Sequence, residues 1–573
     1  MKPALLALLL AAAPSGGAGP GDLLAEAAPG LQAVSPSAIS AGTRFLSSDL
    51  LEGRGTGTPG HEIAALWVAT QMQAIGLEPA GADGRWEQPV PLRAWKVDPI
   101  ASSLVIHGPG LPPVRLVRGQ EFVSISDGEH AVVEMDGALA FAGYAITAPE
   151  YGYDDLKGVD LTGKIAVVLE GAPSSDRPGF FPPAPRADLA RTREKLRRIA
   201  AKGAAGVILV HTPEMERSYA PWETYAAARA AEQFAWVEGA VPGEAVPGLP
   251  ARVLVSWKGF ERIAAAAGLP GGAQAILDEI AANRPRARDL PLKASIRTAT
   301  EIRPAVSANV LGILKGSDPA LARQTVVVTA HLDHLGVGEP VDGDAIYNGA
   351  ADNAIGVAVL LEVARALAAM PRRPARSVLF AAVTGEEKGL VGSSYLALHV
   401  PPAAGLPVAC LNVDGAPTVA PLATAVARGA EHSTLGAAVA RAAGAMGIPV
   451  VPDPAPNAAV FVRSDQFSFV RQGVPSLYVT PGPDPAETPE ERDRRRAASR
   501  GRYHSPRDEW DAAWLWEEAA RLARLDFLVA WTVAGARERP AWNRGDFFER
   551  YVQAARQAPA RPVLRQGVPV PAN

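Results

Sequence analysis

The chain has 573 residues, of which 48% are hydrophobic and 20% are charged. These values are typical of globular proteins and exclude a disordered chain, and the length favours several domains of roughly 150 residues each. The 56 basic and 60 acidic residues give a net charge of −4, which does not favour a protein that binds nucleic acid or an anionic membrane. The single cysteine, Cys410, excludes an intrachain disulfide and a cysteine-based zinc site.

The first residues have the pattern of an export signal. Lys2 precedes the apolar run 4–13 (ALLALLLAAA), and Pro14 and small residues follow. This order of charged, apolar and small residues is typical of a secretory signal peptide, and the run is too short to cross about 30 Å of hydrocarbon. We predict a signal peptide over residues 1–19, a periplasmic or extracellular protein, and no membrane span after cleavage.

Hydrophobic patterns divide the rest of the chain into parts. A helical pattern early in the chain ends at Gly76. Short β-like runs such as 165–169 (IAVVL) and one basic helix at 191–204 follow, and later apolar runs alternate with helical stretches as in βαβ units. We predict an α/β domain in two parts, at 35–131 and 298–535, with a mixed, mostly parallel sheet flanked by helices. A β-rich insertion at 132–297 separates the two parts, and a loosely packed C-terminal tail follows at 536–573.

Several short motifs approach known functional patterns but lack a required residue. Residues 55–60 have dinucleotide-loop spacing without a preceding strand, and residues 158–164 resemble a phosphate-binding loop but are followed by Ile165 instead of Ser or Thr. The His-Glu pair at 61–62 has no second histidine three residues later, and no G-x-S-x-G motif occurs. These motifs therefore favour neither a nucleotide-binding protein nor a serine hydrolase.

Acidic and imidazole groups follow successive strand-like runs in the last large region. Because ligands gather beyond the carboxyl ends of parallel strands, we expect these groups to share one crevice. Four carboxylates so close together are unfavourable unless cations neutralise them. The residues concerned are His331, Asp352, Glu386, Glu387 and Asp414.

This set of donors predicts a metal site. Imidazole and carboxylate ligands suit Zn²⁺, with Mn²⁺ or Co²⁺ as substitutes, and two ions about 3.5–4 Å apart need a bridging carboxylate. Asp352 precedes a helix and is the natural bridge. Asp333 is expected to accept the free imidazole N–H of His331. Of the adjacent Glu386 and Glu387, one is expected to bind metal and the other to act as general base, because neighbouring side chains diverge.

These segments resemble the two-zinc exopeptidases of peptidase family M28, clan MH. The resemblance rests on 51–57 (LEGRGTG), 330–336 (AHLDHLG), 347–353 (YNGAADN), 385–393 (GEEKGLVGS), 412–414 (NVD), 464–475 and 503–508 (YHSPRD). It implies the zinc-exopeptidase (phosphorylase/hydrolase-like) fold and two Zn²⁺ per chain. It assigns His331 and Asp414 to one zinc, Glu387 and His504 to the other, and Asp352 as the bridge. It also makes Glu386 the general base and Asp333 the partner that supports the His331 ligand.

The same resemblance implies that the insertion is a protease-associated domain, from 141–144 (FAGY), 161–165 (LTGKI) and 202–207 (KGAAGV). It implies an aminopeptidase that releases N-terminal residues from peptides through a zinc-activated water. A glutamate-carboxypeptidase-like metallocarboxypeptidase, a dipeptidase and a receptor-like binding protein remain alternatives. Tyr503, Arg502 and Arg463 flank the last ligand and are candidate substrate-binding residues, since an arginine pairs with a terminal carboxylate. The peptide substrate is the only partner predicted.

Overall fold

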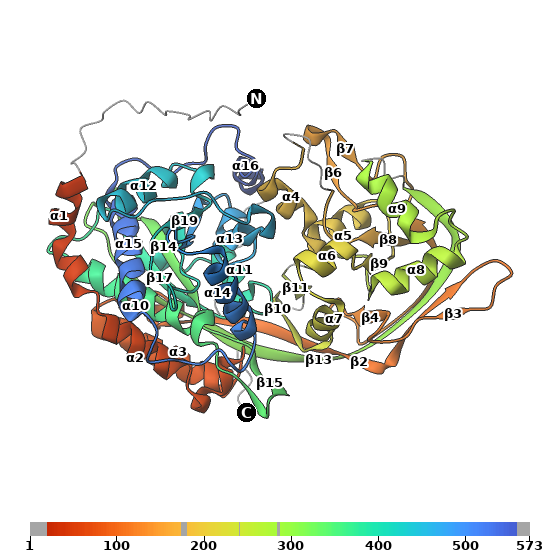
Figure 1. Ribbon diagram of the computed structural model, residues 1–573, viewed down its shortest axis with the longest axis horizontal. Helices are drawn as coiled ribbons and strands as arrows, with labels where there is room; N and C mark the ends of the chain where they lie inside the picture. The colour runs from red at the N-terminus through yellow and green to blue at the C-terminus, as the bar shows by residue number, and fades with distance from the viewer. Residues whose placement is uncertain (1–19, 174–179, 240, 244, 283–286, 558–573) are drawn as a thin grey trace.

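The computed structural model describes residues 20–173, 180–239, 241–243, 245–282 and 287–557. Two bodies lie next to each other and are joined by two long antiparallel strands (Figure 1), β2 (Glu87–His107) and β13 (Arg288–Leu314). We call residues 20–97 and 300–557 the main body and residues 98–299 the inserted body. The predicted signal peptide at 1–19 lies outside the described residues.

The main body is built on a mixed sheet whose central strands are parallel. They are β17 (Ser377–Val383), β14 (Gln324–His331), β18 (Leu406–Asn412) and β20 (Ser476–Pro481), with β19 (Ala425–Arg428) and β13 antiparallel at either side. Every residue of β17 is buried, as expected for a parallel strand that is covered on both faces. The predicted mixed, mostly parallel sheet is confirmed.

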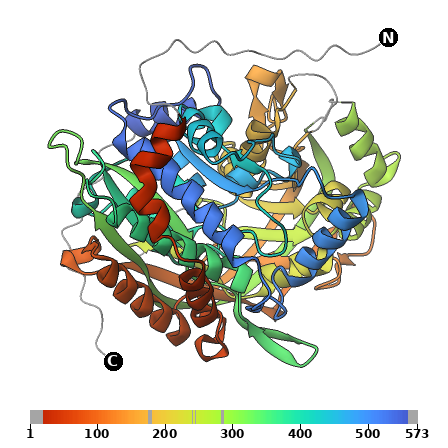
Figure 2. The ribbon, with the colours of Figure 1, turned by 60° about the vertical axis from the view of Figure 1, so that its left-hand side comes forward.

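Helices cover both faces of this sheet. One face packs on the larger apolar core and the other on a smaller core, and the N-terminal α1 lies beside the C-terminal α15 (Figure 2). The larger core is formed with α1 (Pro20–Ala33), α2 (Pro36–Leu46), α3 (Pro59–Ile75), α10 (Ile355–Ala368), α12 (Leu435–Ala445) and α15 (Trp516–Gly535), and the smaller one with α11 (Val391–Leu398) and α13 (Gln466–Val470). The predicted helix end is present, because Gly76 follows α3 with φ +89° and caps it.

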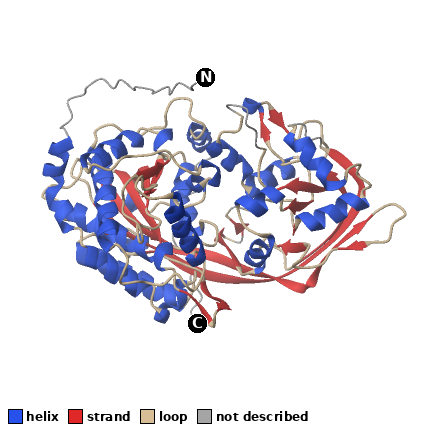
Figure 3. Cartoon of the chain, viewed as in Figure 1, coloured by secondary structure: helices blue, strands red, loops and turns tan. Residues whose placement is uncertain are grey.

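The inserted body is also α/β and not β-rich as predicted (Figure 3). Its sheet has parallel strands β5 (Val132–Phe141), β8 (Ile165–Leu169), β9 (Gly206–Val210) and β12 (Ala251–Val255), with β4 (Phe122–Ile125) antiparallel at the edge. Helices surround it: α4 (Pro183–Ala190), α5 (Thr192–Ala201), α6 (Pro213–Ser218), α7 (Trp222–Ala230), α8 (Trp257–Ala266) and α9 (Gly272–Ala281). The sequence indicated only one of these helices, the basic one at 191–204, which corresponds to α5.

The insertion begins earlier than residue 132. Leu104 and Phe122 belong to the core of the inserted body, and β4 pairs with β12. The chain passes from one body to the other inside β2, and β13 has a bulge between Arg297 and Ala299 where it returns. The crossing in β2 lies at Asp98-Pro99, where the Asp98 carboxylate accepts the backbone N–H groups of Ile100 and Ala101. The predicted boundary did not use this turn dipeptide.

The C-terminal segment packs more tightly than predicted. Trp542 and Phe548 are buried in a cluster with Phe461 and Phe467, and α16 (Glu549–Gln557) follows. Loose packing is therefore wrong for residues 537–557, because a few aromatic side chains outweigh the polar composition; residues 558–573 lie outside the described part. Among the described residues, no helix is both long and apolar enough to span a membrane.

The remaining short elements flank these two bodies. Two of them matter below: β10 (Gln233–Glu238), which pairs with β2 at residues 92–95, and α14 (Pro489–Arg502), which precedes His504. The others are β1 (Glu78–Pro79), β3 (Val114–Arg115), β6 (Thr147–Ala148), β7 (Tyr153–Asp154), β11 (Val241–Pro242), β15 (Gly336–Val341) and β16 (Asp344–Tyr347).

Candidate metal centre

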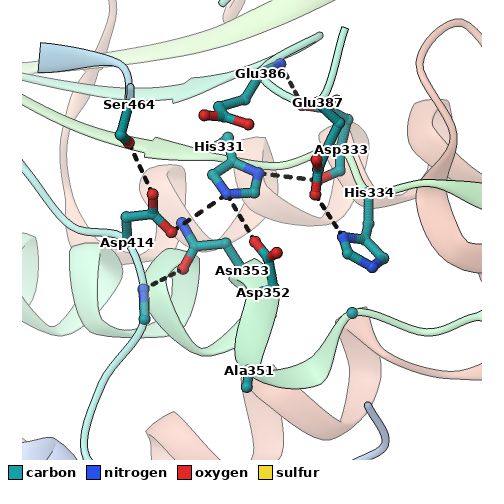
Figure 4. A network of polar contacts seen from close by, with 12 residues as sticks. His331, Asp333, His334, Ala351, Asp352, Asn353, Glu386, Glu387, Asp414 and Ser464 are labelled. Carbon is teal, nitrogen blue, oxygen red and sulfur yellow. Dashed lines mark hydrogen bonds and ion pairs between the residues drawn. The ribbon is translucent and has the colours of Figure 1, made fainter. Parts of the chain in front are cut away.

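The predicted metal ligands meet at the carboxyl ends of the parallel strands of the main body (Figure 4). His331 is the last residue of β14, Glu387 follows β17, and Asp414 follows β18. Asp352 lies in the loop that leads into α10, and His504 follows α14. Strand ends at one edge of a parallel sheet therefore deliver side chains from distant parts of the sequence to one place.

These side chains form two groups that share Asp352. The Nε2 atom of His331 lies 3.1 Å from Asp352 Oδ1 and 3.5 Å from Asp414 Oδ1. The Nε2 atom of His504 lies 3.2 Å from Asp352 Oδ2 and 3.2 Å from Glu387 Oε2. Each oxygen of Asp352 thus faces a different imidazole, which is the arrangement expected of a bridging carboxylate.

His334 belongs to this centre, although it was not among the ligands predicted from the sequence. It is fully buried, and its Nδ1 lies 2.9 Å from Glu387 Oε1. Potential ligand atoms of His334, Asp352 and Glu387 lie within 4.8 Å of one another, as do those of His331, Asp352 and Asp414. The other ring nitrogen of His334, Nε2, has no hydrogen-bond partner among the described residues.

The titration of the centre reflects its negative charge. Burial disfavours the imidazolium form of His331, but contacts with Asp352 and Asp414 raise the pKa well above its ordinary value. His504 behaves alike: its contacts with Asp352 and Glu387 overcome burial and raise its pKa to about 10. An environment that stabilises protonated imidazoles so strongly also stabilises bound cations.

The carboxylates show the matching shifts. Burial would raise the pKa of Asp352, but hydrogen bonds from His331 and His504 hold it well below its ordinary value. Burial and Asp352 would raise the pKa of Glu387, but the imidazoles of His334 and His504 lower it to about 2. Both carboxylates are therefore ionised at neutral pH and available as metal ligands.

Asp333 supports the centre differently from the prediction. The Nδ1–H of His331 donates to the backbone carbonyl of Asp333 at 3.1 Å, and not to its carboxylate. The carboxylate instead accepts the Glu386 backbone N–H at 3.0 Å and the Thr56 hydroxyl at 3.1 Å. The expected tautomer of His331 is kept, with Nε2 facing Asp352, while the Asp333 side chain positions the Glu386 loop.

Glu386 and Glu387 point in different directions, as expected for adjacent residues (Figure 4). Burial, together with the charges of Glu387, Asp465 and Asp414, raises the pKa of Glu386 well above its ordinary value. Asp465 is itself fully buried nearby, and burial raises its pKa to about 7. The centre therefore contains ionised carboxylates and, beside them, a carboxyl group that takes up a proton readily.

Neighbouring groups fix the two acidic loops. The Asp508 carboxylate accepts the backbone N–H groups of Ala351 and Asp352, each at 3.0 Å. The Asn353 side chain donates to the Val413 carbonyl at 3.0 Å and accepts the Gly415 N–H at 2.8 Å. Asn353 thus ties the loop of Asp352 to both neighbours of Asp414. The Asp352–Asn353 peptide bond is cis.

A buried arginine joins the N-terminal segment to these loops. Arg54 has 1% of its surface exposed; its Nε donates to the Leu332 carbonyl at 2.9 Å and its guanidinium to Asn348 and Gly349 at 2.7 and 3.0 Å. It also donates to the Leu46 carbonyl. Burial lowers the pKa of Arg54 to about 10, so the group stays charged. Residues 51–57 were part of the family resemblance found in the sequence, but the role of Arg54 as a donor to these loops was not predicted.

The candidate substrate-binding residues differ in their relation to the centre. The Tyr503 ring stacks on His504 with centroids 3.8 Å apart, and 57% of Tyr503 is exposed. Arg463 is exposed and directly precedes Ser464, whose hydroxyl donates to Asp414 Oδ2 at 2.7 Å. Arg502 is the last residue of α14, and no contact joins its side chain to the described residues of the centre.

The described residues fit a pair of zinc ions. Two imidazole–carboxylate groups share one carboxylate, and zinc accepts such nitrogen and oxygen ligands. The buried Nε2 of His334 lacks a hydrogen-bond partner among the described residues, and Oε1 of Glu387 has only its contact with His334, whereas buried polar groups are ordinarily satisfied. A cation between these groups would give the oxygen a second partner and offset the charge.

Comparison with known proteins identifies the region that carries the centre. Residues 309–529 match the model of peptidase family M28. This region of the chain therefore resembles peptidase family M28. The M28 region contains all the predicted ligands and the predicted general base, and the resemblance inferred from the sequence is confirmed there.

Relatives of the chain include a "Probable zinc metalloprotease" of Pyricularia oryzae, 42% identical over 95 residues, which are 16% of this chain and 18% of that protein. "Aminopeptidase NAALADL1" of Mus musculus is 35% identical over 107 residues, or 18% of this chain and 12% of that protein. The chain thus matches a fifth or less of the length of these curated relatives.

A solved structure extends the likeness to both bodies. The aminopeptidase from Aneurinibacillus sp. strain AM-1 has a TM-score of 0.51 and 19% sequence identity, and the match covers 89% of this chain and 96% of that chain. At this identity the likeness shows a shared fold. The predicted zinc-exopeptidase fold is confirmed by it.

Proposed function

We propose that this protein is a zinc-dependent aminopeptidase that removes N-terminal residues from peptides. The observation that carries the proposal is the pair of imidazole–carboxylate groups that share Asp352. The names of two similar proteins, an aminopeptidase of known structure and a mouse aminopeptidase, support the direction of cleavage.

In this proposal His331 and Asp414 hold one zinc ion, and Glu387 and His504 hold the other, with Asp352 between them. His504 is preferred over His334 for the second ion because its Nε2 lies 3.2 Å from both Asp352 and Glu387, whereas His334 forms an ion pair with Glu387 and not with Asp352. Zinc bound there supplies Lewis acidity that polarises the scissile carbonyl and activates water.

The chain itself supplies the proton transfers. Glu386 takes a proton from the attacking water and delivers it to the leaving amine. Its raised pKa suits a group that must hold a proton between these two steps. Asp333 supports this role by fixing the backbone N–H of Glu386 at 3.0 Å.

A single variant tests the assignment of the base. Glu386→Gln keeps the shape of the side chain, so we expect the purified variant to retain two zinc ions per chain by mass spectrometry. Its kcat should fall by about 10²–10⁴, the usual contribution of a general base. Glu62→Gln, an exposed change on α3, is the matched control. Turnover near the wild-type rate in Glu386→Gln would overturn the assignment.

The direction of cleavage needs a separate measurement. An aminopeptidase recognises a free α-ammonium group, so N-acetylation of a dipeptide substrate should abolish turnover. A carboxypeptidase or dipeptidase would instead lose activity when the C-terminal carboxylate is amidated. A receptor-like binding protein would bind peptides without cleaving any of them, and it would need no zinc.

We also propose that the protein is exported and that the inserted body is a protease-associated domain. The export proposal rests on the apolar segment at 4–13. N-terminal sequencing of protein recovered from the periplasm or medium should give a start near residue 20, and a start at residue 1 or 2 would contradict cleavage. The contribution of the inserted body to substrate binding is argued below.

A further inference from the structure

Two basic residues next to the metal centre are covered by aromatic rings of the inserted body. The guanidinium of Arg463 lies 5.0 Å from the ring centroid of Tyr219. The ammonium of Lys388 lies 5.9 Å from the ring centroid of Phe234 on β10. Arg463 directly precedes Ser464, and Lys388 directly follows Glu387. The inserted body therefore reaches both ends of the centre through cation–π contacts.

The contact at Arg463 lies where the centre is open to solvent. The side chain of His504 is 34% exposed and that of Asp414 is 22% exposed, so a ligand can approach from this side. Tyr219 is 48% exposed despite its contact with Arg463. Half of its surface is thus available to another molecule, whereas Phe234 is buried.

A buried network holds Tyr219 in this position. Its ring packs edge-on against Tyr225 with centroids 5.5 Å apart, and the Tyr225 hydroxyl donates to Glu170 at 2.7 Å. His211 stacks on Tyr225 at 4.8 Å. Nε2 of His211 lies 3.0 Å from the carbonyl of Ala220 and so fixes the residue after Tyr219.

The network stands at the carboxyl ends of β8 and β9, since Glu170 and His211 directly follow these strands. A half-exposed aromatic residue fixed by buried side chains loses little conformational entropy when it binds a ligand. Tyr219 is therefore held in a position where it can contact a ligand. A ring that only joined the two bodies would not need an exposed surface of this kind.

We propose that Tyr219, held against Arg463, is a specificity-determining residue that contacts the peptide substrate beyond its N-terminal residue. This inference rests on the proposed function, because it assumes that peptides bind at the centre beside Arg463. The inserted body then takes part in choosing the substrate, and the M28 region alone would not account for the selectivity of the protein.

Leucyl substrates of increasing length test the proposal. Kinetic constants are measured for leucine p-nitroanilide, Leu-Gly and Leu-Gly-Gly-Gly with the full-length zinc-loaded protein. Tyr219→Ala should raise KM for the tetrapeptide at least fivefold, with kcat and the p-nitroanilide constants within twofold of wild type. Tyr219→Phe keeps the ring over Arg463 and should behave like wild type.

Two further variants separate substrate contact from a structural role. Arg463→Ala should give the same change as Tyr219→Ala, and the double variant should show no larger change, because the two residues act as one unit. Glu150→Ala removes a different contact between the inserted body and the C-terminal segment, the 2.8 Å ion pair with Arg550, and should leave the ratio of tetrapeptide to p-nitroanilide kcat/KM unchanged.

The outcomes are distinct. If the ratio of tetrapeptide to p-nitroanilide kcat/KM is unchanged in Tyr219→Ala, the inference is overturned even if total activity or Tm falls. A structural defect would lower kcat/KM for all three substrates together. A wild-type protein that cleaves none of the three substrates with zinc overturns the proposed function, and this inference with it.

Discussion

Arg54 offers a sharp test of how the centre is held in place. The change Arg54→Met keeps most of the side-chain volume but removes every donor, so the carbonyls of Leu46, Leu332, Asn348 and Gly349 lose their partner. Each buried acceptor left unpaired costs about 1–3 kcal/mol. Removing a buried guanidinium also relieves several kcal/mol of desolvation. The net loss should be about 3–5 kcal/mol of unfolding free energy, typical of breaking a buried charged contact.

The expected shift in Tm follows from the size of the unit that unfolds. With an unfolding entropy of about 2.1 cal/mol/K per residue, a main body of roughly 330 residues has about 0.7 kcal/mol/K. Arg54→Met should then lower Tm in calorimetry by about 4–7 °C. Zinc content should fall as well, because the loops after His331 and before Asp352 lose their common anchor.

A nearby arginine provides the control. Arg44 is exposed, and its guanidinium lies 5.2 Å from the Trp510 ring centroid, a contact worth about 0.5–1 kcal/mol. Arg44→Met should therefore change Tm by about 1 °C. If Arg54→Met melts within 1 °C of wild type with full zinc content, the buried guanidinium does not organise the centre and the reasoning fails.

Four other substitutions have expected outcomes. His504→Ala should reduce zinc from two ions to one per chain by mass spectrometry, whereas His334→Ala should keep two; the reverse result would exchange their roles. Phe548→Ala should lower the unfolding free energy by about 3–5 kcal/mol, the usual cost of emptying a buried aromatic site; no loss would mean that the C-terminal segment is dispensable for stability. Burial lowers the pKa of Lys195 to about 7, so between pH 7 and 10 the unfolded chain binds more protons than the folded one and stability rises with pH. In denaturant titrations the unfolding free energy of Lys195→Met should rise between pH 6 and 9 by about 1–3 kcal/mol less than that of wild type. An equal pH dependence in the two proteins would show that the pKa of Lys195 is not lowered.

Three of the metal ligands were predictable because each of them lies at or just after the end of an apolar run. His331, Glu387 and Asp414 stand at or just after the ends of buried strands, and a parallel sheet places such ends together. The hydrophobic pattern alone is therefore enough to predict that these three side chains lie at the same edge of the sheet. His504 follows a helix without buried residues, so no apolar pattern marks it, and only the family resemblance indicated its role.

Other features depend on packing that no local pattern encodes. His334 is buried partly because Gly349 adopts φ +60° beside it, where a β-carbon would lie 2.4 Å from the His334 ring. Whether His331 bonds the carbonyl or the carboxylate of Asp333 depends on backbone direction within a few residues. The start of the inserted body was missed because the turn at Asp98-Pro99 lies inside a longer β-like segment, and the pairing of β2 with β13 continues on both sides of it.

One segment of the main body connects three distant parts of the chain to the centre. Residues 456–462 contact α4 of the inserted body, and Phe461 packs against Phe548 with centroids 5.4 Å apart. Two residues after this segment, Ser464 donates to Asp414 and also accepts a hydrogen bond from Asn412 at 2.7 Å. A displacement of either the inserted body or the C-terminal segment would therefore move the residue that orients Asp414. The effect of Phe548→Ala should accordingly extend beyond stability to weaker zinc binding at the ion that His331 and Asp414 are proposed to hold, while the ion at Glu387 and His504 is retained.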